Sequence, residues 1–173
     1  LPAPSPHSPK RPPYNEGRFF VFTFSPFRNS IPTAAAMFTV TRYHDISCGH
    51  RVCGHESKCS HLHGHNYRIT FCCAGELDSL GRVIDFSVIK EKLCVWLEEH
   101  FDHRFLIWTE DPLADALLSL DPKVVQVPFN PTAENIAEYL VTVVGPEQLR
   151  GTGVKLIRCD VEETRKCTAT YTL

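Results

Sequence analysis

The chain lacks a pronounced charge of either sign. Its 18 Lys and Arg residues nearly balance its 20 Asp and Glu residues, which leaves a formal net charge of −2. A protein that binds nucleic acid or an anionic membrane surface through its electrostatic field carries a basic excess. The composition therefore argues against nucleic-acid and membrane partners and favours a small-molecule or protein partner.

Paired CxxC spacing is also absent, although the chain contains eight cysteines. The cysteines are scattered, and the adjacent pair Cys72 and Cys73 would point to opposite faces of a strand. This distribution does not suggest the disulfide framework of a small secreted protein. With 173 residues, 43% of them hydrophobic, the chain can bury a core without such cross-links. We expect a reducing, cytoplasmic location.

Methionine occurs once, at Met37, and regular patterning begins there. The residues before it hold eight of the 13 prolines, and proline interrupts helices and strand ladders. The apolar run FFVFTF in this part is short and is followed by Pro26, which argues against a secretory signal. We interpret residues 1–36 as a proline-rich disordered N-terminal extension, residues 37–173 as the folded domain, and Met37 as a candidate natural start.

Two strands are expected first in the domain. TVTRYHDIS, which follows Phe38, is rich in β-branched and aromatic residues and leads toward His50. Residues 66–74 alternate with period two, which is typical of a half-buried strand. The residues on its apolar parity are Tyr67, Ile69, Phe71 and Cys73.

Two helices and two more strands follow. Residues 86–101 and the segment NPTAENIAEYLVTVV have apolar residues at helical spacing. The two stripes comprise Ile89, Leu93, Trp96 and Leu97, and Ile136, Leu140, Val143 and Val144. Residues 154–163 and 167–173 are predicted strands, the first with Ile157, Val161 and Glu163 on one parity. The order β-β-α-α-β-β predicts an α+β fold, an antiparallel sheet with both helices on one face.

The run KCSHLHGHNY at residues 58–67 concentrates potential metal ligands. His63 and His65 are two residues apart, so on an extended backbone both rings project from one face, and Gly64 leaves room between them. His50 on the preceding strand can supply a third nitrogen. Three histidines leave one tetrahedral position open, which is typical of a catalytic Zn²⁺ site.

Other readings of the same polar residues remain open at this point. Cys53, His55, Cys59 and His61 are the ligands of an alternative, closed structural zinc site. Further along, Asp102 and His103 could act as a proton-carrying pair or lie at a solvated helix end. If Glu163 follows the parity of its strand it faces inward and needs a partner.

Six ordered motifs between Met37 and the last residue resemble those of the 6-pyruvoyltetrahydropterin synthase family. They are HRV at 50–52, CSHLHGHNY at 59–67, VIDF at 83–86, FDHRFL at 101–106, NPTAEN at 130–135 and VEET at 161–164. The three residues between Cys59 and His63 resemble the branch that forms 6-carboxy-5,6,7,8-tetrahydropterin in queuosine biosynthesis. The pyruvoyl-forming branch typically has a wider gap, and its reaction is the alternative, with a non-enzymatic zinc-binding domain as the third possibility.

The resemblance implies a lyase that converts 7,8-dihydroneopterin triphosphate to 6-carboxy-5,6,7,8-tetrahydropterin, acetaldehyde and triphosphate. It implies the tunnelling fold, in which subunits join their sheets into a barrel, and a homohexamer with active sites between subunits. Residue by residue, it implies the following roles: His50, His63 and His65 hold Zn²⁺, Cys59 is the catalytic thiol, Asp102 and His103 form a second proton-transfer pair, Glu163 anchors the pterin, and Thr132 assists.

Overall fold

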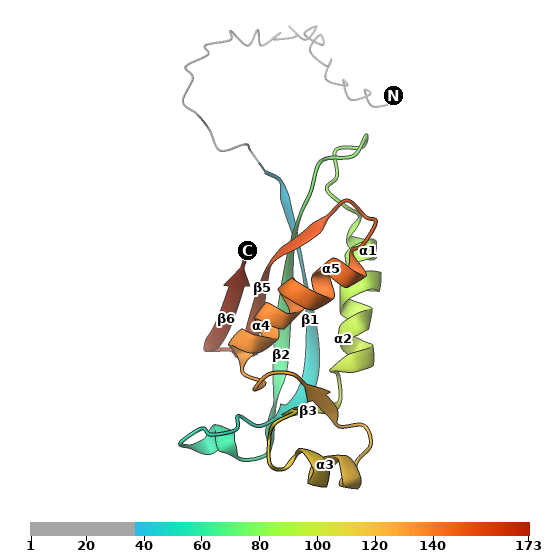
Figure 1. The fold of residues 1–173 in the computed structure, drawn as a ribbon. Coiled ribbons are helices and arrows are strands. Elements are labelled where there is room, and N and C mark those ends of the chain that lie inside the picture. The colour runs from blue at the N-terminus through green and yellow to red at the C-terminus, as the bar shows by residue number, and fades with distance from the viewer. Residues whose placement is uncertain (1–36) are drawn as a thin grey trace, which may run out of the picture. The chain divides into compact units, whose positions relative to one another are not determined.

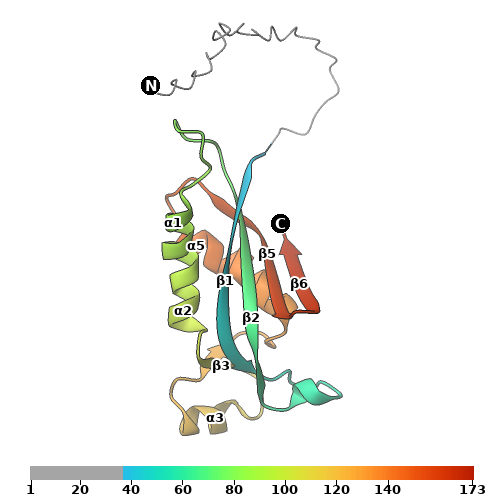
Figure 2. The ribbon, with the colours of Figure 1, turned by 180° about the vertical axis from the view of Figure 1, so that it is seen from behind.

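The computed structural model describes residues 37–173. The predicted extension of residues 1–36 lies outside the described residues. The described part contains one sheet with the strand order β4-β3-β1-β2-β5-β6. The two long helical segments cover one face of this sheet (Figures 1 and 2). The predicted α+β class is confirmed.

The observed strands agree with the predicted antiparallel sheet in part and add two strands to it. Their bounds are β1 (Thr39–His50), β2 (His63–Ala74), β3 (Arg104–Trp108), β4 (Val125–Val127), β5 (Lys155–Thr164) and β6 (Cys167–Thr172). β1, β2, β5 and β6 pair in antiparallel fashion, as expected. β3 and β4 were not predicted, and they run parallel to β1, so the sheet is mixed. These strands have five and three residues, too few for a clear alternating pattern.

Both predicted helices form, each as a series of consecutive helical segments. The first series runs through α1 (Phe86–Ile89), a π-helical stretch (Lys90–Cys94) and α2 (Val95–His100). The second runs through α4 (Ala133–Tyr139), a π-helical stretch (Leu140–Val144) and α5 (Gly145–Gln148). Side-chain caps mark their starts: Asp85 accepts from the Ser87 N–H and Thr132 from the Asn135 N–H. An additional helix, α3 (Ala114–Leu120), lies between β3 and β4.

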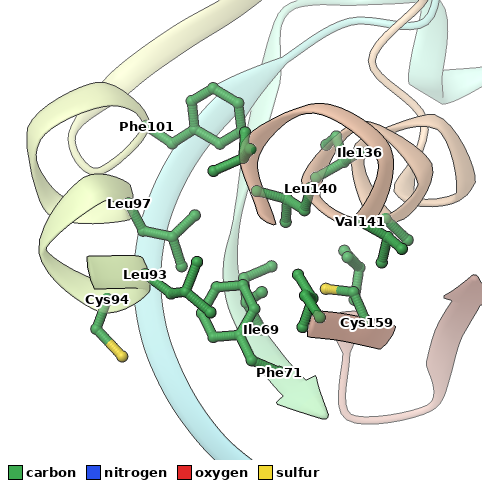
Figure 3. Close-up of a cluster of buried hydrophobic side chains, with 14 of the residues drawn as sticks. Ile69, Phe71, Leu93, Cys94, Leu97, Phe101, Ile136, Leu140, Val141 and Cys159 are labelled. Carbon is green, nitrogen blue, oxygen red and sulfur yellow. The ribbon is translucent and has the colours of Figure 1, made fainter. Parts of the chain in front are cut away.

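The two helices meet over the inner face of the sheet. Figure 3 shows Leu93 and Leu97 from the first helix opposite Ile136 and Leu140 from the second, above strand residues that include Phe71. The predicted stripes are therefore largely correct. Val143 is the exception, because it is 45% exposed and Val141 is buried in its place.

The predicted alternation of β5 is wrong before a β-bulge and correct after it. Cys72 pairs with Arg158, whereas Cys73 pairs with Leu156, so one residue of β5 is skipped. Leu156 is consequently buried and Ile157 is only half-buried. Beyond the bulge Val161 faces the core as predicted.

No helix in residues 37–173 is both long and apolar enough to cross a membrane.

The row of buried side chains along the central strand pair, β1 and β2, ends in polar residues. On β1 the inward parity passes from Ile46 and Cys48 to His50, and on β2 it begins with His63 and His65 before Tyr67. The fold thereby places imidazoles where the apolar core stops.

Candidate metal centre and active site

Three histidines lie together at the end of the β1–β2 pair. His50 is the register partner of His63, and Cys48 is the partner of His65. All three imidazoles project from the core-facing side, and His50 is almost completely buried. The structure thus brings together the three histidines that the sequence nominated as metal ligands.

Gly64 allows the two strands to approach closely between the histidines. A Cβ atom on Gly64 would lie 3.0 Å from the backbone oxygen of Cys48 and 3.3 Å from the Cα atom of Gly49. Such contacts are tighter than side chains normally tolerate. A glycine is therefore needed where the strand pair presents His63 and His65 on one face.

The hydrogen bonds of two rings define which nitrogen faces the site. Nδ1 of His50 lies 2.7 Å from the Pro131 carbonyl oxygen, and Nδ1 of His63 lies 2.8 Å from the His61 carbonyl oxygen. A carbonyl oxygen only accepts, so each Nδ1–H donates, and in the neutral form of each ring Nε2 carries the lone pair. Burial, the largest effect, also lowers the pKa of His50 and favours its neutral form.

The three Nε2 atoms are buried and have no hydrogen-bond partner. One ligand atom from each of His50, His63 and His65 lies within 4.8 Å of the others. Buried nitrogen lone pairs without a donor are costly unless a cation occupies the space between them. The donor set, three imidazoles of which His50 and His63 have carbonyl-fixed tautomers, fits Zn²⁺.

Glu163 lies beside this cluster. Its Oε1 atom is 3.4 Å from Nε2 of His50 and 3.7 Å from Nε2 of His65. The Tyr67 hydroxyl donates toward the same oxygen over 3.5 Å, a weak contact. Burial, followed by the charge of Glu163, raises the pKa of Tyr67 and keeps the phenol protonated. Of the two orientations that the sequence left open for Glu163, the structure has the inward one, toward the histidines.

A cavity of about 480 Å³ opens next to Glu163. Its lining includes Cys59, Thr132, Lys166 and Glu163. Cys59 belongs to the 3₁₀ turn η1 (Lys58–Ser60), and Thr132 caps α4. The cavity therefore joins the candidate thiol and both candidate substrate-binding residues, with Glu163 connecting it to the histidine cluster.

The loop that carries Cys59 is held by Asn130. The Asn130 side chain accepts from the Cys53 N–H over 2.9 Å and donates to the Cys53 carbonyl oxygen over 2.8 Å. The Val52 N–H in turn donates to the Cys59 carbonyl oxygen over 2.7 Å. Sequence analysis did not assign this role to Asn130, although an Asn-Pro pair just before a helix start is a recognisable loop signal.

Asp102 and His103 form a pair, but they do not reach the Cys59 cavity within one chain. Asp102 accepts from the Ser47 N–H over 2.8 Å and lies 2.9 Å from Nδ1 of His103. Burial opposes the Asp102 charge, but these contacts outweigh it and hold its pKa below the ordinary value. His103 instead lines a second cavity of about 370 Å³, together with His65.

The alternative structural zinc site does not form in the part of the chain that the structure describes. There, the histidine triad is the group whose ligand atoms converge, and Cys53, His55, Cys59 and His61 are not part of it. His55 lies against Glu56, and His61 is exposed. The closed site proposed for these four residues is therefore wrong.

Sequence comparison with characterised families agrees with this geometry. The family model described as 6-pyruvoyl tetrahydropterin synthase matches residues 39–173. A protein of Rickettsia felis named 6-carboxy-5,6,7,8-tetrahydropterin synthase is 34% identical over 134 residues, which cover 76% of this chain and 97% of that protein. A Haemophilus influenzae protein of the same name is 32% identical over 129 residues, covering 69% and 92% of the two chains.

Solved structures share the fold. An uncharacterized protein from Wolinella succinogenes has a TM-score of 0.69 and 25% identity, and the match covers 80% of this chain and 99% of that one. The 6-pyruvoyl tetrahydropterin synthase of Caenorhabditis elegans has a TM-score of 0.58 and 25% identity, with 80% and 96% covered. The chain therefore belongs to the 6-pyruvoyl tetrahydropterin synthase family, an enzyme family.

Proposed function

We propose that the chain is a zinc-dependent 6-carboxytetrahydropterin synthase of queuosine biosynthesis. It would convert 7,8-dihydroneopterin triphosphate to 6-carboxy-5,6,7,8-tetrahydropterin, acetaldehyde and triphosphate. The observation that carries the proposal is the convergence of three unpartnered Nε2 atoms beside a cavity lined by Cys59, Thr132 and Glu163. The names of the relatives and the three-residue gap between Cys59 and His63 support this product over the pyruvoyl product.

His50, His63 and His65 would hold the Zn²⁺. When bound, the ion would act as a Lewis acid on substrate oxygens and acidify the adjacent carbon and hydroxyl groups. The two carbonyl contacts to His50 and His63 keep these rings in the ligating tautomer before the ion arrives.

The remaining residues bind the substrate and move protons. The Glu163 carboxylate can accept two adjacent N–H groups of a pterin ring, and the Thr132 side chain stands on the wall of the same cavity. Cys59 as a thiolate removes a proton from the substrate side chain. His103, oriented by Asp102, returns a proton at another position.

This division of labour requires more than one chain. Cys59 and His103 line different cavities of the same chain. We place the His103 of one subunit against the Cys59 cavity of the next, in a homo-oligomer that we expect to be a hexamer. The 81% exposed His103 side chain is free to contact a neighbouring copy.

Product analysis tests the proposed reaction. The zinc-loaded protein is incubated with 7,8-dihydroneopterin triphosphate, the pterin is identified by mass spectrometry, and acetaldehyde is measured independently. A 6-carboxy pterin with an equal amount of acetaldehyde supports the proposal. A pterin that keeps all three side-chain carbons, formed without acetaldehyde, would assign the chain to the pyruvoyl-forming reaction instead.

A further inference from the structure

The cavity of about 370 Å³ that His103 lines is rich in hydrogen-bond donors. The polar side chains of its wall belong to Ser47, His65, Asn66, His103 and Arg104. None of the described residues in this wall is an aspartate or a glutamate. Imidazole, carboxamide and guanidinium groups all carry N–H donors, so the wall has the chemistry of an anion site.

Arg104 supplies the positive charge of this wall. It is the first residue of β3 and is half-buried, and it forms no ion pair within residues 37–173. Asp102, the carboxylate nearest to it in sequence, is engaged by the Ser47 N–H and by Nδ1 of His103. Four other arginines of the described part pair with aspartates: Arg51, Arg68, Arg82 and Arg158. The guanidinium of Arg104 is therefore available to an anionic ligand.

Two hydrogen-bonding contacts orient the neighbouring donors. The Ser47 hydroxyl donates to Oδ1 of Asn66 over 2.8 Å, which occupies the amide oxygen and leaves the NH₂ group to donate. Asp102 lies 2.9 Å from Nδ1 of His103 and leaves Nε2 of that ring for another partner. Asn66 and His103 thus add donors next to the charge of Arg104.

Charge distinguishes this cavity from the Cys59 cavity. The wall of the Cys59 cavity contains two carboxylates, Glu134 and Glu163, and one lysine, Lys166. Carboxylates attract the N–H groups of a pterin ring but repel a triphosphate chain, which carries several negative charges. The two ends of the proposed substrate therefore have opposite electrostatic requirements, and each cavity meets one of them.

We propose that Arg104 and Asn66 form the subsite that binds the triphosphate chain of the substrate. The inference rests on the proposed function and assigns residues to the part of the substrate that Glu163 does not bind. The planar guanidinium can hold phosphate oxygens through two parallel N–H groups, and the Asn66 amide adds another donor. In the proposed oligomer, the copy that supplies His103 to a site also supplies Arg104, because the two residues are adjacent and line one cavity.

Binding of inorganic triphosphate to the zinc-loaded protein tests the subsite without any pterin. Isothermal titration calorimetry compares the wild type with Arg104→Gln, which removes the charge and keeps a polar side chain. Arg150→Gln is the matched control, since Arg150 is exposed and lines neither cavity. Contact of triphosphate with the zinc itself affects all of these proteins equally. Circular dichroism and zinc content check that each variant is folded and loaded.

A second variant changes the subsite without touching Arg104. Asn66→Asp keeps an acceptor for the Ser47 hydroxyl but replaces the amide donor with a negative charge. We expect Arg104→Gln and Asn66→Asp each to bind triphosphate about 10–100-fold more weakly than the wild type, because a hydrogen bond to a charged group contributes about this factor. Arg150→Gln should match the wild type.

Several results would overturn the proposal. They are wild-type affinity in Arg104→Gln, no measurable binding by the wild type, and a loss of binding in Lys166→Gln alone, which would place the chain in the Cys59 cavity. If Arg104→Gln does not fold, Asn66→Asp decides in its place.

Kinetics show whether the subsite serves the substrate or only free polyphosphate. In Arg104→Gln the KM for 7,8-dihydroneopterin triphosphate should rise by a similar factor, whereas binding of 7,8-dihydroneopterin, which lacks the phosphates, should not change. An unchanged KM would contradict the proposal. Because inorganic triphosphate carries no pterin, the binding result is independent of the product assay. A failed product assay leaves the anion subsite standing, and wild-type triphosphate affinity in Arg104→Gln leaves the reaction standing.

Discussion

Replacing Asn130 with alanine removes the clamp on the Cys59 loop. Two hydrogen bonds to the Cys53 backbone are lost, and each is worth about 0.5–1.5 kcal/mol, so the free energy of unfolding should fall by about 1–3 kcal/mol. That corresponds to a decrease in Tm of about 2–4 °C per kcal/mol for a domain of this size. Turnover should suffer far more, because a displacement of about 1 Å at a reacting group can reduce the rate 10²-fold.

Zinc content separates this effect from general disruption. His50 is held through the Pro131 carbonyl oxygen, so Asn130→Ala should retain its metal while kcat falls. Asp78→Ala is the matched control: Asp78 also accepts two backbone N–H groups, at 2.8 and 2.9 Å, and it lines neither of the cavities at the site. The control should lose stability but keep its kcat. Wild-type kcat in Asn130→Ala, or loss of zinc together with activity, would refute the reasoning.

Three further predictions concern the proton-transfer residues. Cys59→Ala should keep its zinc and its Tm but lose about 10²-fold or more in kcat, and loss of metal would instead indicate a structural cysteine. Mixed oligomers of Cys59→Ala and His103→Ala, assembled from the two inactive proteins, should recover activity if sites are shared between copies, whereas sites within one chain predict no recovery. The native pKa of Asp102 is lowered, so its carboxylate stabilises the fold above about pH 4 and this contribution is lost as the pH falls through the lowered pKa. Urea unfolding from pH 6 to pH 3 should therefore show the wild type losing its stability advantage over Asp102→Asn at the acidic end, and an advantage that does not change with pH would contradict the assignment.

Much of the fold could be predicted from periodicity. The long antiparallel strands and the two helices carry clear patterns because each buries one face over many residues. β3 and β4 are too short for such a pattern, and the parallel pairing of β3 with β1 and of β4 with β3 depends on contacts between distant segments. The exposure of Val143 and of Ile157 likewise depends on packing and on a bulge that the local sequence does not reveal.

The site was partly predictable for a similar reason. His63 and His65 share a face on any extended backbone, so their proximity follows from the sequence alone. The hydrogen bond from His50 to the Pro131 carbonyl oxygen could not be predicted. Every residue has a backbone carbonyl group, so the sequence does not indicate which one accepts. The separation of His103 from Cys59 also required coordinates, because motif order does not indicate which cavity a side chain lines.

Zinc titration of the chelator-stripped protein, with acetaldehyde release from 7,8-dihydroneopterin triphosphate as the readout, tests the central claim most directly. One site built from His50, His63 and His65 predicts that the rate rises with added zinc and levels off at about one ion per chain. Full turnover by the stripped protein would contradict the account. So would a zinc-dependent reaction that yields a three-carbon pyruvoyl product and no acetaldehyde.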